Sequence, residues 1–178
     1  PALKKKRGYT NYTELINFIN ELKESHPSVV SIQYIGESQK GYNIPVVHIK
    51  TSNSSEKIKI WMQAGLHGNE PAGTEGLLYY MHSILNDVSY NKLLEGVDLL
   101  ILPMANIDGY LKDNRYAANG LDLNRDQTKL MAPETRLIKK VFSDFNAHVG
   151  LDFHEYRPYR KIRQVATVVG SRRRRPFG

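Results

Sequence analysis

Two apolar segments of strand length, residues 57–64 and 97–102, constrain the fold of this chain more than any other feature. Residues 97–102 are apolar at nearly every position, which is typical of a strand covered on both faces. Residues 57–64 begin by alternating Lys with Ile and then become mostly apolar, so we expect this strand near the centre of a sheet. A helical pattern at residues 71–85 lies between them. This order predicts an α/β fold with a mixed central β-sheet and helices on both faces.

Periodicity and turn residues indicate the other elements. A helix is expected over residues 10–25, where Asn11 and Glu14 have the spacing of a capping box. Pro45 favours an edge position for its strand, because proline cannot donate a ladder hydrogen bond. The remaining expected elements are antiparallel strands at 29–35 and 44–49, a helix at 133–145, a short buried strand at 149–153 that runs into His154 and Glu155, and a strand at 164–169.

The basic residues are concentrated at the two ends of the chain. Of the 25 Lys and Arg residues, four form the run at residues 4–7, and eight lie in residues 157–178, which contain no acid. Neither aromatic interleaving nor a nucleic-acid motif accompanies these residues, so we expect solvated tails and no nucleic-acid partner. We predict a single domain over residues 1–178, with a core at about 9–170 and a basic tail at each end.

Composition excludes several kinds of chemistry. The chain of 178 residues contains no cysteine, which excludes disulfides, a thiol nucleophile and a Cys-ligated metal. No apolar run approaches the roughly 18 residues that span a bilayer, so we expect no membrane span. The chain starts with Pro rather than Met, which fits removal of a leader. On that basis we expect an extracellular or periplasmic protein.

A histidine and a glutamate follow the first of the two apolar strands. His67 and Glu70 lie three residues apart, just past the end of the strand at 57–64. Open α/β sheets place their binding sites at the carboxyl ends of strands. Imidazole and carboxylate are ordinary zinc ligands, and a catalytic zinc takes three protein ligands. His154 ends another apolar strand and is a candidate third ligand. The alternative is a solvated turn that carries two unrelated polar residues.

A long polar segment, residues 106–128, separates the strand at 97–102 from the next helix. A structureless loop of this length in a compact domain is usually functional. Arg115 and Arg125 supply cations, and Asn124 supplies an amide, which together suit the binding of a substrate carboxylate and an oxyanion. The alternative is a solvated loop in which Asn, Asp and Gly serve as turn formers.

Taken together, these motifs resemble the zinc carboxypeptidase family of metallopeptidases, of the carboxypeptidase A type. The resemblance runs through most of the chain in the family's order. It comprises Tyr12 and Glu14, the run from Ile35 to Ser38 with Gly41, His67-Gly68-Asn69-Glu70, Asn106-Ile107-Asp108-Gly109, Arg115 nine residues before Asn124-Arg125, and Asp152-Phe153-His154.

The resemblance implies a role for each matching residue. His67, Glu70 and His154 would hold one zinc ion, and a zinc-activated water would attack the C-terminal peptide bond of a peptide substrate. Asp122 would orient His67 from behind. Arg115 would polarise the scissile carbonyl and stabilise the oxyanion, while Asn124 and Arg125 would bind the substrate's free carboxylate.

The chain departs from the family after His154. The family's catalysis needs a general-base glutamate and a closing tyrosine on later elements, and the only acid after His154 is Glu155. Adjacent strand residues point to opposite faces, so Glu155 is poorly placed for that work. We therefore expect a carboxypeptidase-like domain that is truncated on its C-terminal side, and a chain that binds zinc but hydrolyses peptides slowly or not at all.

Three other functions remain open. Peptidoglycan-peptide amidases and aspartoacylase-like deacylases have similar site motifs, although the N-terminal helix, the turn at residues 36–41 and residues 106–110 favour the peptidase. A non-catalytic zinc- or peptide-binding module is the alternative of a different class. The missing general base makes that alternative more credible.

Overall fold

A six-stranded mixed β-sheet forms the centre of the fold. The computed structural model describes residues 8–51, 57–156 and 166–169, so most of both predicted basic tails lies outside the described residues. The strands are β1 (Val30–Glu37), β2 (Asn43–Lys50), β3 (Ile58–Ala64), β4 (Val97–Leu102), β5 (Val149–Glu155) and β6 (Ala166–Val169). Their order is β1-β2-β4-β3-β5-β6, in which β4, β3 and β5 are parallel and the outer pairings are antiparallel. The predicted mixed sheet is confirmed.

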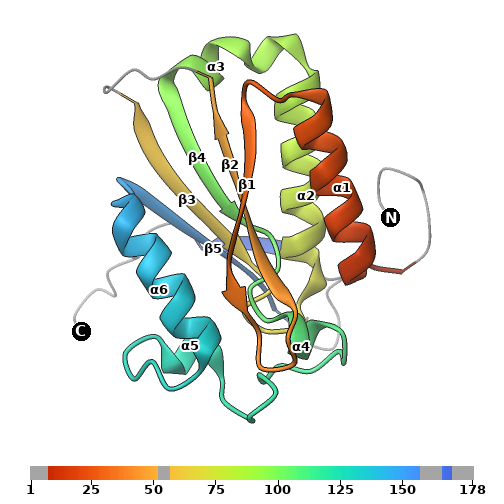
Figure 1. Ribbon diagram of the computed structural model, residues 1–178, viewed down its shortest axis with the longest axis vertical. Coiled ribbons are helices and arrows are strands. Elements are labelled where there is room, and N and C mark those ends of the chain that lie inside the picture. The colour runs from red at the N-terminus through yellow and green to blue at the C-terminus, as the bar shows by residue number, and fades with distance from the viewer. Residues whose placement is uncertain (1–7, 52–56, 157–165, 170–178) are drawn as a thin grey trace, which may run out of the picture.

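Helices cover both faces of this sheet. The helical elements are α1 (Tyr12–Ser25), α2 (Pro71–Asn86), the 3-10 turn η1 (Val88–Tyr90), α3 (Asn91–Gly96), α4 (Ile107–Tyr110), α5 (Leu123–Asp126) and α6 (Pro133–Phe145). Helices α1 and α2 lie on one side of the sheet and α6 lies on the other (Figure 1). Within the described part of the chain, no helix combines the length and the apolar character that a bilayer crossing requires.

Helix α1 starts where its sequence predicts. The Asn11 side chain accepts a hydrogen bond from the Glu14 N–H at 2.9 Å, and the Glu14 carboxylate accepts one from the Asn11 N–H at 3.0 Å. These reciprocal bonds form a capping box, which satisfies two N–H groups that have no partner inside the helix. The Tyr12 hydroxyl then donates to the Asn43 carbonyl at 2.9 Å, and so ties the start of α1 to β2.

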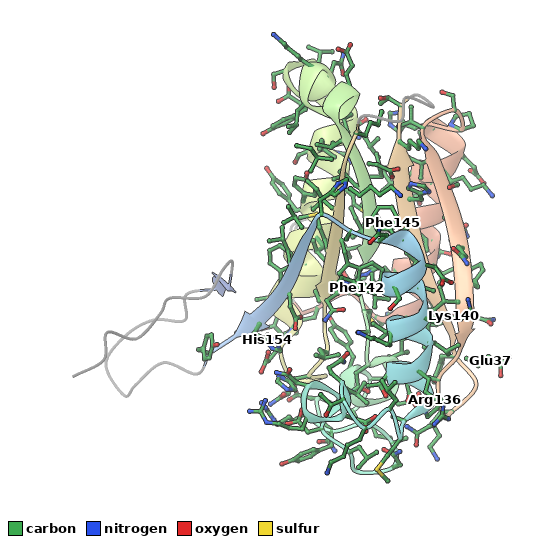
Figure 2. The ribbon with its side chains drawn as sticks, turned by 90° about the vertical axis from the view of Figure 1, so that its left-hand side faces the viewer. Glu37, Arg136, Lys140, Phe142, Phe145 and His154 are labelled. Atoms are coloured by element: carbon green, nitrogen blue, oxygen red, sulfur yellow. The ribbon has the colours of Figure 1, made fainter. Side chains whose placement is uncertain are left out.

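The core fills the space between the sheet and its helices. All six residues of β4 are buried, as its apolar composition predicts. On the α6 side, the Trp61 ring of β3 packs edge-to-face on Phe142, with 5.8 Å between ring centroids. Figure 2 shows Phe142 and Phe145 on the side of α6 that faces the sheet, whereas the Lys140 side chain is 73% exposed.

Strand β2 is not at an edge, so the interpretation of Pro45 was wrong. Strand β2 lies between β1 and β4, and β1 is the outer strand. Pro45 pairs with Tyr34 of β1, while the register between β2 and β4 begins at Val47. The missing N–H of proline therefore costs no hydrogen bond to β4, which explains how an interior strand tolerates it.

Two further expectations fail in detail. Strand β5 is partly exposed rather than buried, and Val149 at its start is 42% exposed. Strand β6 pairs only with residues 152–155 of β5, so among the described residues Val149 has no strand neighbour on that side. The polar segment 106–128 is not structureless either, because it contains the single-turn helices α4 and α5.

Asp126 holds the chain in place just before α6. Its buried carboxylate accepts hydrogen bonds from the backbone N–H groups of Met131 and Ala132 and from the Thr135 hydroxyl. Burial acts to raise the pKa of Asp126, but these hydrogen bonds outweigh it and hold that pKa below its ordinary value. The stabilising charge is therefore fully present above the ordinary carboxyl pKa and is lost as the pH falls through the lowered value.

Replacing Asp126 with Ala should lower the free energy of unfolding at neutral pH by about 1–3 kcal/mol for each of the two N–H groups left without an acceptor. Urea titration followed by circular dichroism measures this change. The control is Asp144→Ala, which removes an exposed ion pair with Lys140 within α6 and should cost less than about 1 kcal/mol. Equal losses in the two variants would contradict an anchoring role for Asp126.

Candidate metal centre

The carboxyl ends of three parallel strands meet at one edge of the sheet. Strand β3 ends in the loop that carries His67, the chain after β4 leads to α4, and β5 ends at His154 and Glu155. The Ala105 N–H donates to the Ala64 carbonyl at 2.9 Å, which keeps the first two connections side by side beyond the strands. Figure 2 shows His154 at the end of β5. The topology thus gathers distant residues into one place.

The loop that carries His67 packs directly against the C-terminal end of α4. A Cβ atom on Gly68 would lie 2.1 Å from the carbonyl carbon of Gly109 and 2.2 Å from the backbone nitrogen of Tyr110. Only glycine permits this approach of two backbones. Asn106 links α4 to the segment that carries Arg115. Its buried side chain accepts a hydrogen bond from the Gly109 N–H at 3.0 Å and donates one to the Arg115 carbonyl at 3.4 Å.

His67, Glu70 and His154 form a cluster that could hold a metal ion. One donor atom from each of the three lies within 4.8 Å of the others. The two carboxylate oxygens of Glu70 face the two rings: Oε1 lies 2.8 Å from His67 Nδ1, and Oε2 lies 2.9 Å from His154 Nδ1. His67 and Glu70 are buried, with 3% and 9% exposure. Two imidazoles and one carboxylate make a ligand set of the catalytic-zinc type.

Nε2 of each ring, the nitrogen that faces away from Glu70, also faces a carboxylate. This arrangement indicates whether a cation fits between the rings and Glu70. His67 Nε2 lies 3.2 Å from Asp122 Oδ1, and His154 Nε2 lies 3.1 Å from Asp152 Oδ2. A neutral ring that donates from Nε2 has a lone pair on Nδ1, and that lone pair then faces Glu70. Two acceptors at 2.8–2.9 Å repel each other unless a proton or a cation lies between them. A divalent cation satisfies all three residues at once.

The neighbouring carboxylates also affect the pKa of His154. The hydrogen bond to Asp152 raises this pKa most, burial lowers it, and the charges of Asp152 and Glu70 raise it further. Together they raise the pKa of His154 to about 9. A metal ion therefore competes with a tightly held proton at this site, as expected for a ligand histidine in a negatively charged pocket.

Arg115 and Asp122 lie beside the cluster. Arg115 Nε donates to Asp122 Oδ2 at 3.1 Å, and its Nη1 lies 3.5 Å from Glu70 Oε1. Partial burial acts to raise the pKa of Asp122, but the His67 ring and the Arg115 guanidinium hold it below its ordinary value. Asp122 also accepts from the Asn124 N–H at 2.9 Å, as the N-cap of α5. Asp122 therefore links the arginine, the histidine and the loop that carries Asn124.

A single cavity of about 630 Å³ contains the predicted ligands and the predicted carboxylate clamp. Its walls bring together six of the seven residues singled out from the sequence, and the seventh, Asp122, contacts His67 and Arg115 from behind. The lining residues are Tyr9, His67, Asn69, Glu70, Pro71, Asp113, Arg115, Asn124, Arg125, His154, Glu155 and Tyr156.

Sequence reasoning missed several of these neighbours. Tyr9, Asp113 and Tyr156 line the cavity from segments that carry no motif. Asp152 was noted only as part of the resemblance, although its position two residues before His154 on one strand is a signal that the two side chains share a face.

Glu155 has its own place at the site. Its backbone N–H donates to Glu70 Oε2 at 3.1 Å. Its carboxylate accepts from the Ala72 N–H at 3.3 Å, in the first turn of α2, where the helix dipole favours a negative charge. The side chain therefore lines the cavity but is engaged with the helix.

Comparison with known proteins decides the family. A family model described as zinc carboxypeptidase matches residues 15–161. This chain belongs to the zinc carboxypeptidase family. Among curated relatives, a probable carboxypeptidase 2 from Arthroderma benhamiae is 36% identical over 160 residues. That match covers 84% of this chain and 30% of the relative. A carboxypeptidase B from Helicoverpa zea is 32% identical over 107 residues, 57% of this chain and 25% of the relative.

Solved structures share the carboxypeptidase fold. The crystal structure of carboxypeptidase A from Helicoverpa armigera superposes with a TM-score of 0.78 at 24% identity, covering 87% of this chain and 50% of that chain. A metallo-carboxypeptidase from Burkholderia cenocepacia gives a TM-score of 0.74 at 20% identity, covering 80% of this chain and 40% of that chain. This zinc carboxypeptidase chain therefore spans half or less of the length of these solved relatives.

Proposed function

We propose that this chain is the zinc-binding and carboxylate-binding part of a metallocarboxypeptidase that hydrolyses the C-terminal bond of peptides. The observation that carries the proposal is the shared cavity: the donors of His67, Glu70 and His154 open into the same space as Arg115, Asn124 and Arg125. A metal beside a cluster of cations and an amide suits a substrate whose scissile carbonyl lies one residue from a free carboxylate.

The residues of the cavity would then bind and orient the substrate. When bound, zinc supplies Lewis acidity, which makes water a nucleophile at neutral pH and polarises the carbonyl. Arg115 lies against Glu70 and can donate to the carbonyl oxygen as negative charge develops on it. Arg125 can hold the terminal carboxylate in a two-pronged grip, with Asn124 beside it. Asp122 orients both His67 and Arg115.

The proton-transfer half of the reaction needs a carboxylate that is free to act as a base. Glu155 is the only acid after His154, and its carboxylate is engaged by the first turn of α2. The contact of Glu155 with α2 supports a second candidate function, a zinc- and peptide-binding module without turnover. We therefore expect this chain to bind peptides with a free carboxylate but to hydrolyse them slowly or not at all.

Peptide binding tests the proposal directly. The zinc-loaded chain is titrated calorimetrically with a short peptide, either as the free acid or as its C-terminal amide. The free acid should bind more tightly, and Arg125→Ala should weaken its binding by about 10- to 100-fold, the value of a charged hydrogen-bonded contact. Lys140→Ala, an exposed change on α6, is the matched control.

The outcomes separate the candidate functions. Equal binding of the acid and the amide would contradict the carboxylate clamp. Preference for a peptide that ends in a diamino acid would favour the peptidoglycan-peptide amidase. Liquid chromatography of the incubated free-acid peptide reports turnover. Rapid zinc-dependent release of the C-terminal residue would overturn the expectation of a slow chain and assign a base within it.

A further inference from the structure

Asp152 lies on the same face of β5 as His154, because alternate residues of a strand point to the same side. Its Oδ2 lies 3.1 Å from Nε2 of the His154 ring. Nδ1 of the same ring lies 2.9 Å from Oε2 of Glu70. A carboxylate thus faces each nitrogen of this imidazole, one from its own strand and one from the loop after β3.

The Glu70 oxygen on the inner side has a fixed position. The backbone N–H of Glu155 donates to Oε2 at 3.1 Å, so the end of β5 holds that oxygen next to the His154 ring. The rings of His67 and His154 lie 4.8 Å apart between centroids, tilted by 45°, and both turn Nδ1 toward Glu70. The inner nitrogens are therefore the pair that can share one ion.

We propose that Asp152 is a positioning residue for the metal, which holds the ring proton of His154 on Nε2 and keeps the Nδ1 lone pair directed at the ion. An ionised carboxylate can only accept a hydrogen bond, so a neutral ring whose Nδ1 binds the ion turns its N–H toward Asp152. The opposite tautomer would set the Nε2 lone pair against that carboxylate. The inference rests on the proposed function, since it takes His154 as a zinc ligand.

Asp152 and Asp122 would then have the same role, each for one of the two histidines. Asp122 faces Nε2 of His67 from the N-cap of α5, and Asp152 faces Nε2 of His154 from within β5. A carboxylate behind a ligand histidine fixes the tautomer and the ring orientation. Because Asp152 and His154 lie on the same strand, the contact between them does not depend on the loop that carries Asp122.

Zinc affinity and ring tautomer test the inference together. Competition with a chromophoric chelator should show Asp152→Asn and Asp152→Ala binding zinc about 10- to 100-fold more weakly than the unchanged chain. Long-range proton–nitrogen NMR of the zinc-loaded chain should report His154 as the Nε2–H tautomer bound through Nδ1, and partial or complete loss of that single bound form in Asp152→Ala. Asp152→Glu, which keeps a carboxylate, should retain the Nε2–H signal. Asp144→Asn, an exposed change on α6, is the control.

Separate outcomes reject the inference and the proposed ligand set. Wild-type zinc affinity in His154→Ala would overturn the ligand set itself. Loss of zinc in His154→Ala, with wild-type affinity and tautomer in both Asp152→Asn and Asp152→Ala, would overturn only the role of Asp152. Urea midpoints of the variants identify any loss of affinity that comes from unfolding, and Asp152→Asn, which preserves side-chain shape, keeps the test valid if Asp152→Ala does not fold.

Discussion

Replacing His67 with Ala should abolish stoichiometric zinc binding by this chain. The change removes one of three proposed ligands, and it also leaves Asp122 and Glu70 without the ring that each contacts, at 3.2 Å and 2.8 Å. The loss should therefore exceed the roughly 10- to 100-fold that follows when only a partner behind a ligand is removed. Metal analysis after gel filtration in a zinc-containing buffer, followed by chelator competition, measures it.

His82→Ala is the matched control for this experiment. His82 lies on α2, and its Nδ1 lies 3.4 Å from the side-chain nitrogen of Asn86 in the same helix. This variant should retain one zinc ion per chain. If His67→Ala retained equimolar zinc with unchanged affinity, the proposed site would be wrong, whatever the family of the chain.

Replacing Gly68 with Ala should lower the free energy of unfolding by at least the upper end of the roughly 1–3 kcal/mol typical of overpacking. The added Cβ would meet three backbone atoms, at 2.1 Å in Gly109, 2.2 Å in Tyr110 and 2.5 Å in Asn114. Backbone atoms cannot rotate away as side chains can, so the loop and α4 must separate. Zinc affinity should fall as well, because His67 is the preceding residue. Urea titration and chelator competition measure the two effects.

Gly76→Ala gives the opposite expectation and serves as the control. Gly76 lies within α2, and a Cβ placed on it would meet no atom within 4 Å. Alanine should stabilise the helix by about 0.5–1 kcal/mol relative to glycine. A small or favourable effect of Gly68→Ala, similar to that of Gly76→Ala, would contradict the close packing of the two backbones.

Long, strongly patterned elements of the fold could be predicted from sequence. The bounds of α6 match the expected helix at 133–145, because proline sets its first turn and Asn146 ends it in a left-handed conformation. Strand β4 and the central place of β3 followed from their apolar composition. The convergence of His67 and His154 was predictable for a related reason: each follows an apolar strand, and parallel strands end at one edge.

The remaining features depend on distant contacts or on elements too short to show a period. Helices α4 and α5 have four residues each, and α3 has six, so the sequence contains too few turns of each to reveal an apolar face. The position of Pro45 in an interior strand depends on where the β4 register begins. The contact of Gly68 with Gly109 joins residues far apart in sequence, and no local pattern indicates it.

The separation of the proposed ligands along the chain has a consequence for folding. Glu70 and His154 are 84 residues apart, and α2, β4 and α6 lie within the segment between them. An ion held by both would act as a cross-link that exists only in the folded state. Zinc at 100 times its dissociation constant would then raise the free energy of unfolding by about 2.7 kcal/mol. The temperature at which the domain unfolds would thus rise with the concentration of free zinc.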